Sequence, residues 1–131
     1  KEKKDRVEDA IYATKAALKE GIVSGGGIAL LNAAGNIKPK NIGEKILVRS
    51  IESPFKTIME NAGIENYEIP TKEGIGFNVI SGNKVDMVEA GIVDPVLVTK
   101  TALQNAVSVV STIISADCVI SNVRVNKNES S

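Results

Sequence analysis

Three consecutive glycines, Gly25 to Gly27, stand between two stretches of helical periodicity and constrain this chain more than any other feature. Glycine loses more backbone freedom in a helix or strand than any other residue, so such a run belongs where the backbone turns or comes very close to another group. If a helix begins directly after the glycines, its free N–H groups and positive dipole end favour an anion. The glycines therefore predict either an anion or nucleotide site or a flexible turn, and the motif alone favours the turn.

Composition excludes several classes of function. Lys plus Arg and Asp plus Glu both number 16, so no net charge recruits nucleic acid or a membrane surface, and we expect neither as a partner. The chain has no His, the commonest metal ligand and proton shuttle. Its one cysteine, Cys118, excludes an internal disulfide and fits a reducing compartment. We also expect no apolar run near the roughly 18 residues needed to span a bilayer.

Apolar periodicity predicts a mainly α fold. Ser53 and Pro54 form a good start for a helix, so two helices should meet at an angle there. Asp94 and Pro95 are likewise a preferred N-cap and first helical residue. The long segment after them is apolar on more than one face, which predicts a central helix surrounded by others. The expected helices cover residues 1–20, 28–34, 43–52, 54–61 and 95–115.

The β structure should be small. Residues 75–80 and 85–88 flank the turn-forming residues 81–84 and predict a β-hairpin, with a short helix over 83–90 as the competing interpretation. Residues 118–123 predict a C-terminal strand that needs a partner from the hairpin or another subunit. The fold class is therefore a helical bundle with a small β-hairpin and a C-terminal strand, followed by a tail over 124–131.

Asp9 is the first candidate for chemistry. It lies nearly opposite the apolar face of the first predicted helix, beside Ala13 and Ala16. A carboxylate next to small side chains could face a ligand or another domain across a narrow gap. An ordinary solvated acid is the default interpretation, because most carboxylates are exposed.

Four stretches, taken together and in this order, resemble the group I chaperonins, the GroEL-type ring-forming folding machines. The stretches are Arg6-Val7-Glu8-Asp9-Ala10 with Ala13-Thr14-Lys15-Ala16-Ala17, then Glu20-Gly21-Ile22-Val23-Ser24-Gly25-Gly26-Gly27, then Glu60-Asn61-Ala62-Gly63, and finally Gly91-Ile92-Val93-Asp94-Pro95 before Lys100-Thr101-Ala102-Leu103-Gln104-Asn105-Ala106.

The resemblance implies a C-terminal piece of a longer subunit and a mainly α fold of the chaperonin equatorial-domain type. Residues 1–20 would be the intermediate-domain helix, 21–123 the C-terminal half of the equatorial ATPase domain, and 124–131 a flexible tail. The intact subunit would be a stress-response chaperone and ATPase that encloses unfolded proteins in a ring of identical subunits under a co-chaperonin lid. The expected location is the bacterial cytoplasm, with the mitochondrial matrix or a plastid as alternatives.

The resemblance also assigns roles to single residues. Asp9 matches the catalytic acid that activates the attacking water, and Gly26 matches the glycine against the ribose and adenine of ATP. Asn78, Val79 and Ile80 match the adenine contacts, and Asp94 matches the acid that binds the ribose hydroxyls.

The same resemblance places the phosphate loop and the Mg²⁺ ligands in an N-terminal half, so none of the residues here is expected to ligate a metal. The alternative function is a non-catalytic structural or assembly module that contributes half of a nucleotide site. Cys118 is expected to be a strand residue and not a nucleophile, because no His is present to activate it.

Overall fold

A computed structural model describes the backbone of residues 1–128 and the side-chain surroundings of residues 1–116. Within these residues the chain is mainly helical with two small sheets, so the predicted fold class is confirmed. The elements are α1 (Glu2–Glu20), β1 (Ile22–Ser24), α2 (Ile28–Gly35), α3 (Ile42–Ile51), α4 (Ser53–Asn61), β2 (Ile75–Asn78), β3 (Asn83–Asp86), β4 (Val93–Pro95) and α5 (Val96–Asn128).

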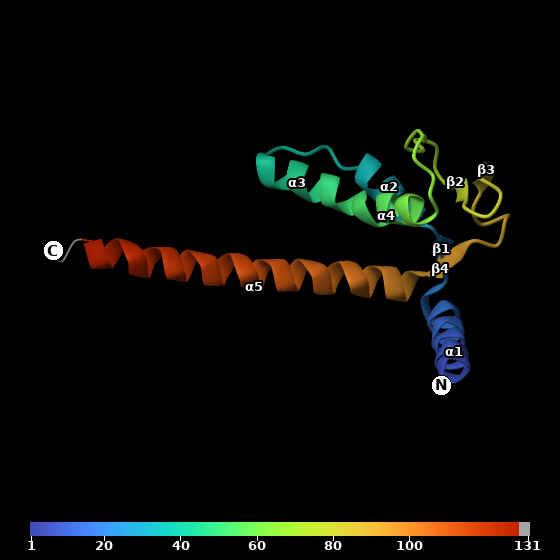
Figure 1. The fold of residues 1–131 in the computed structure, drawn as a ribbon, viewed down its shortest axis with the longest axis horizontal. Coiled ribbons are helices and arrows are strands. Elements are labelled where there is room, and N and C mark those ends of the chain that lie inside the picture. Colours follow the sequence, from blue (N-terminus) through green and yellow to red (C-terminus); the bar gives the residue numbers. More distant parts are fainter. Residues whose placement is uncertain (129–131) are drawn as a thin grey trace.

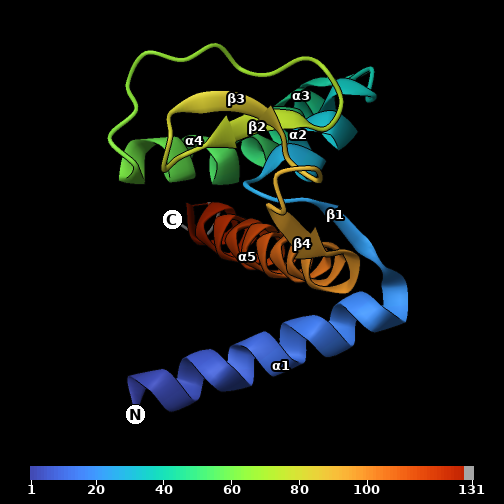
Figure 2. The same cartoon turned by 90° about the vertical axis from the view of Figure 1, so that its right-hand side faces the viewer.

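A two-stranded antiparallel ribbon pairs β1, which follows α1, with β4, which precedes α5. Val23 lies opposite Asp94 in this ribbon. Helices α2 to α4 and the hairpin lie on one side of it and α1 on the other (Figures 1 and 2). The prediction of Asp94 as a helix N-cap is wrong, because pairing with the distant β1 extends the backbone there and α5 begins one residue after Pro95. The N–H of Val96 instead donates to the carbonyl of Gly21 at 3.1 Å.

The predicted hairpin is confirmed. Strand β2 pairs with β3 in an antiparallel register that places Gly76 opposite Val85 and Asn78 opposite Asn83. Residues 79–82 form the turn between the strands. Strand β2 is two residues shorter than expected, because the turn begins directly after Asn78, and β3 begins two residues earlier than expected with the expected length.

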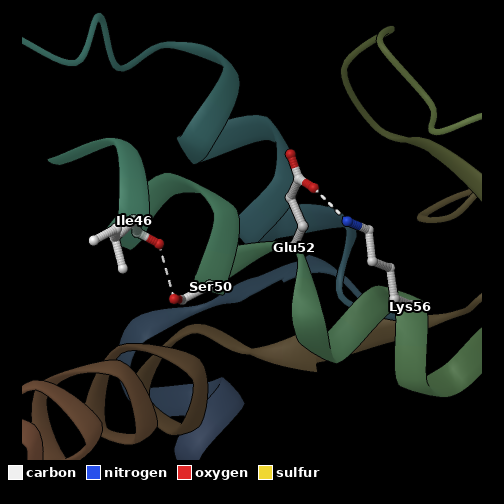
Figure 3. A network of polar contacts seen from close by, with 4 residues as sticks. All are labelled: Ile46, Ser50, Glu52 and Lys56. Atoms are coloured by element: carbon white, nitrogen blue, oxygen red, sulfur yellow. Dashed lines mark hydrogen bonds and ion pairs between the residues drawn. The ribbon is translucent and has the colours of Figure 1, made fainter. Parts of the chain in front are cut away.

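The junction of α3 and α4 confirms the predicted change of direction before Pro54. Asn41 caps α3 by accepting a hydrogen bond from the N–H of Glu44 at 2.9 Å. Glu52 separates the two helices, and its carboxylate pairs with Lys56 at 2.7 Å, one turn into α4 (Figure 3). Pro54 sits in the first turn of α4, where its missing N–H costs no helical hydrogen bond.

The hydrophobic core lies between α2, α4 and the hairpin. Four side chains are almost completely buried: Phe55, Ile28, Met59 and Met87. Phe55 is the centre of an aromatic group, with its ring 5.5 Å from Tyr67 and 6.3 Å from Phe77. None of the side chains in this core, or packed against it, comes from the described part of α5.

Helix α5 is not the surrounded central helix that the sequence predicts. It packs against α1 and β4 near its start, runs below α4 and α3, and then extends past them (Figure 1). With 33 residues, it is about 50 Å long at the usual rise of about 1.5 Å per residue. Its exposed apolar side chains in the described part are Val98, Val107, Val109, Val110, Ile113 and Ile114.

The predicted C-terminal strand is also wrong. Residues 118–123 continue α5 and form no strand, and residues 124–128 are helical, whereas 129–131 lie outside the described residues. β-Branched side chains favour strands only weakly, and a helix that is already formed extends at little cost. By length and composition alone, Val96–Ala116 is also long and apolar enough to cross a bilayer, contrary to the expectation that no such run is present.

Candidate functional site

The three glycines form a tight turn that packs against three other segments, with Gly25 buried and Gly26 and Gly27 half-buried. The N–H of Gly25 donates to the carbonyl of Ile92 at 2.9 Å. A Cβ on Gly26 would lie 2.9 Å from Cε of Met87, and a Cβ on Gly27 would lie 2.8 Å from the backbone nitrogen of Phe55. Gly26 and Gly27 also have positive φ angles of 64° and 78°, which side chains disfavour. The turn is therefore a fixed part of the core and not a flexible link.

A helix does begin directly after the glycines, as the sequence predicts. Gly27 is the N-cap of α2, and the N–H of Ile28 donates to the carbonyl of Gly25 at 3.1 Å. Gly27 offers no side chain to cap the helix. Internal packing nevertheless accounts for each of the three glycines without a ligand, so the turn alone does not identify a nucleotide site.

Asp94 reaches the same part of the molecule through the ribbon. It lies opposite Val23 in the ribbon, and Val23 is separated from the glycine turn only by Ser24. Ile92, two residues earlier, holds Gly25 by the backbone hydrogen bond described above. The Asp94 side chain is exposed, yet the protein atoms around its carboxyl displace part of the water and raise its pKa above the ordinary value of 3.8.

Asn78, Val79 and Ile80 lie at the tip of the hairpin. The side-chain carbonyl of Asn78 accepts the N–H of Ile80 at 3.0 Å and stabilises the turn. This leaves the amide nitrogen of Asn78 as the group that could reach a ligand. Val79 is 42% exposed and Ile80 95% exposed, so neither side chain is part of an apolar pocket formed by the described residues.

Asp9 lies apart from the other candidates. It is exposed on α1 and lines a groove of about 550 Å³ between this helix and the first turn of α5. Besides Asp9 the groove is lined by Tyr12, Ala13, Lys15, Ala16, Lys19, Leu97 and Val98. None of the other predicted site residues lines it. The structure thus joins the segments that carry Gly26 and Asp94, through the Gly25–Ile92 hydrogen bond and the ribbon, and leaves Asp9 on the other side of the ribbon.

One ion pair links the end of α1 to α5, against which α1 also packs. The carboxylate of Glu20 at the end of α1 lies 2.8 Å from Nζ of Lys100 in α5. Gly21 follows directly with a φ of 87°, and nothing lies within 4 Å of where its Cβ would be. Sequence reasoning missed this pair, because the two charges are far apart in the chain and no periodic signal connects them.

The residues that surround the glycine turn were also missed. Phe55, Met87 and Ile92 come from three separate segments, and each was interpreted only as part of its own helix, strand or loop. In the part of the chain that the structure describes, no group of three or more Asp, Glu, Cys or His side chains is placed to hold a metal ion.

A protein-family model described as the TCP-1/cpn60 chaperonin family matches residues 1–124.

Proposed function

The chain belongs to the TCP-1/cpn60 chaperonin family, and from this premise we propose that it is part of a group I ATP-driven chaperonin. In this proposal α1 belongs to the intermediate domain, and the elements from β1 to α5 form half of the equatorial ATPase domain. The intact subunit works in a ring of identical subunits, with a co-chaperonin lid that closes over an unfolded protein. Its proposed location is the bacterial cytoplasm, with the mitochondrial matrix or a plastid as alternatives.

The observation that carries the proposal is the joining of Gly26 and Asp94 through one packed unit. The bond from Gly25 to Ile92 and the β1–β4 ribbon hold the glycine turn and the acid together. A glycine offers a flat backbone surface to a ribose, and an exposed carboxylate can accept hydrogen bonds from its hydroxyls. The amide of Asn78 could donate to a ring nitrogen of adenine from the hairpin side.

Asp9 is exposed, as a catalytic carboxylate must be, but it could reach a nucleotide at Gly26 and Asp94 only if α1 moved. It is on a helix that joins the ribbon through the single residue Gly21, next to the Glu20–Lys100 ion pair. A rotation of α1 about Gly21 would carry Asp9 toward a nucleotide, where its carboxylate would orient a water molecule and accept its proton. ATP would supply the phosphoryl group, and Mg²⁺ would neutralise its charge. Ligands for Mg²⁺ would come mainly from the N-terminal half of the subunit.

A second function is favoured for the 131 residues taken by themselves. The groove at Asp9 contains none of the nucleotide-contact candidates, and α5 exposes apolar side chains along its described length. Both features fit a piece that completes its site and covers its helix only with the rest of the domain. The isolated chain would then be a non-catalytic assembly module that carries half of a nucleotide site.

The test compares Asp9→Asn with the neighbouring Glu8→Gln in the intact subunit. Asn keeps the size of the side chain and removes the proton acceptor, so ATP turnover should fall by about 10²- to 10⁴-fold with ATP affinity nearly unchanged. Glu8 is an exposed acid on the same helix turn, paired with Lys4 at 3.7 Å, and its loss should leave turnover within about twofold. Equal turnover in Asp9→Asn and in the unsubstituted subunit would refute the role of Asp9.

Calorimetry of ATP binding, with and without Mg²⁺, distinguishes the two functions. The half-site proposal predicts binding by the intact subunit and none by the 131-residue chain. Tight binding by the isolated chain would contradict it and would place a complete phosphate site within these residues.

A further inference from the structure

Gly76 lies where the hairpin packs tightly against two core side chains. It lies in β2 opposite Val85 and is buried. A Cβ on Gly76 would lie 2.5 Å from Cγ1 of Ile28 and 2.8 Å from Sδ of Met87. Both distances are under the 3.0 Å that real Cβ atoms keep. The hairpin can occupy this position only because residue 76 has no side chain.

The two neighbours of Gly76 are the same side chains that support the glycine turn. Ile28 begins α2 directly after Gly27, and Met87 places its Cε against Gly26. Both are 1% exposed, so neither can move aside into solvent. Met87 is also fixed by its backbone, because its N–H donates to Gly74 at 3.0 Å and its carbonyl accepts from Ile92 at 2.8 Å.

A methyl group at position 76 would therefore push β2 away from Ile28 and Met87 more easily than it would move those two side chains. The displacement needed to bring the closest contact to 3.0 Å is about 0.5 Å. Asn78 is two residues further along the same strand, whereas Gly26 stays with the α2 side. The substitution thus changes the distance between these two candidate nucleotide contacts. Gly76 is not among the glycines with positive φ, so the effect comes from space and not from backbone strain.

We propose that Gly76 is a positioning residue for the base and ribose side of the nucleotide site, because it lets the hairpin close against Ile28 and Met87 and so sets the distance between Asn78 and Gly26. The proposal rests on the nucleotide site of the proposed function and adds a residue that does not itself touch the ligand.

The test is Gly76→Ala in the intact subunit, with ATP hydrolysis and calorimetric ADP binding as readouts. The KM for ATP and the Kd for ADP should both rise on the order of tenfold, because misplacement of about 0.5 Å weakens contacts to base and sugar. The kcat should change little, since these contacts bind ground state and transition state alike. Gly35→Ala is the matched control, because its Cβ would meet nothing within 4 Å and its φ is not positive.

The double variant Gly76→Ala with Ile28→Ala tests the contact itself. Removing most of the Ile28 side chain relieves the closest contact and opens space into which the Met87 side chain can shift from its own 2.8 Å contact, so the double variant should have the KM of Ile28→Ala alone. This arm also decides the case in which Gly76→Ala does not fold. A double variant that does not fold either, or whose KM is tenfold above that of Ile28→Ala, would overturn the proposed contact.

Two further outcomes separate the inference from the function on which it rests. Gly76→Ala that folds and keeps both constants within twofold would overturn the positioning role and leave the nucleotide site intact. An unsubstituted subunit that neither binds ADP nor hydrolyses ATP would overturn the proposed function itself.

Discussion

Replacing Gly27 with Ala should destabilise the chain by more than the loss of a left-handed glycine explains. Gly27 has a φ of 78°, and its Cβ would lie 2.8 Å and 2.9 Å from the backbone N and Cα of Phe55. The positive φ costs about 1 kcal/mol after the gain from a stiffer unfolded chain. The contact adds about 1–3 kcal/mol, because a helix backbone cannot move aside as the end of a side chain can.

Gly63→Ala is the control that separates the two terms. Gly63 has a φ of 70°, and nothing lies within 4 Å of where its Cβ would be. Only the backbone term of about 1 kcal/mol should apply to it. The difference in the free energy of unfolding between the two variants therefore measures the packing of the glycine turn against α4.

Urea unfolding followed by circular dichroism gives this difference. With equal slopes of about 1–3 kcal/mol per molar urea, Gly27→Ala should have a midpoint roughly 1 M below that of Gly63→Ala. Equal midpoints would refute the reasoning, since they would mean that Phe55 and α4 move away from the turn at no cost. A changed slope would instead report a different unfolded or native state and would need a second probe.

Two further predictions concern charges. The folded-state pKa of Asp94 is raised above 3.8, so the contribution of Asp94 to stability is present below pH 3.8 and is lost as the pH rises through the folded-state pKa. Asp94→Asn should therefore have a higher Tm than the unsubstituted protein at pH 7 and the same Tm near pH 3. A lower Tm for the variant at pH 7 would contradict the sign. Glu20 and Lys100 are partly exposed, so a double-mutant cycle with Glu20→Gln and Lys100→Met should give a coupling of about 0.2–1 kcal/mol that shrinks in 1 M salt. A coupling that does not change with salt would show that the two side chains interact by packing and not by charge.

The sequence predicted the parts of the fold whose signals are local. Apolar periodicity predicted the helices, and Pro54 marked the change of direction between α3 and α4. The turn-forming residues 81–84 predicted the hairpin but placed its turn two residues after the observed position, 79–82. Strands β1 and β4 are three residues long, too short for an alternating pattern, so their pairing was missed. For the same reason Asp94 was assigned to a helix cap, where local preference points.

The candidate site was predictable to a lesser degree. The periodicity placed Asp9 on the polar face of α1, and the glycine run suggested a ligand or a turn, but the roles of both came from the family resemblance. The contacts that make the glycines necessary come from Phe55, Met87 and Ile92, which no spacing rule connects with residue 26. The roles of Asp9, Gly26, Asn78, Val79, Ile80 and Asp94 stay predictions.

The β1–β4 ribbon also dictates the order in which the chain can fold. Its two strands enclose α2, α3, α4 and the hairpin in a single loop, so their pairing has a high contact order and must overcome the entropy of closing that loop. On the ribosome β1 emerges well before β4. The core of α2, α4 and the hairpin can form in that interval, whereas the strand that carries Asp94 can pair with β1 only after the hairpin has been synthesised.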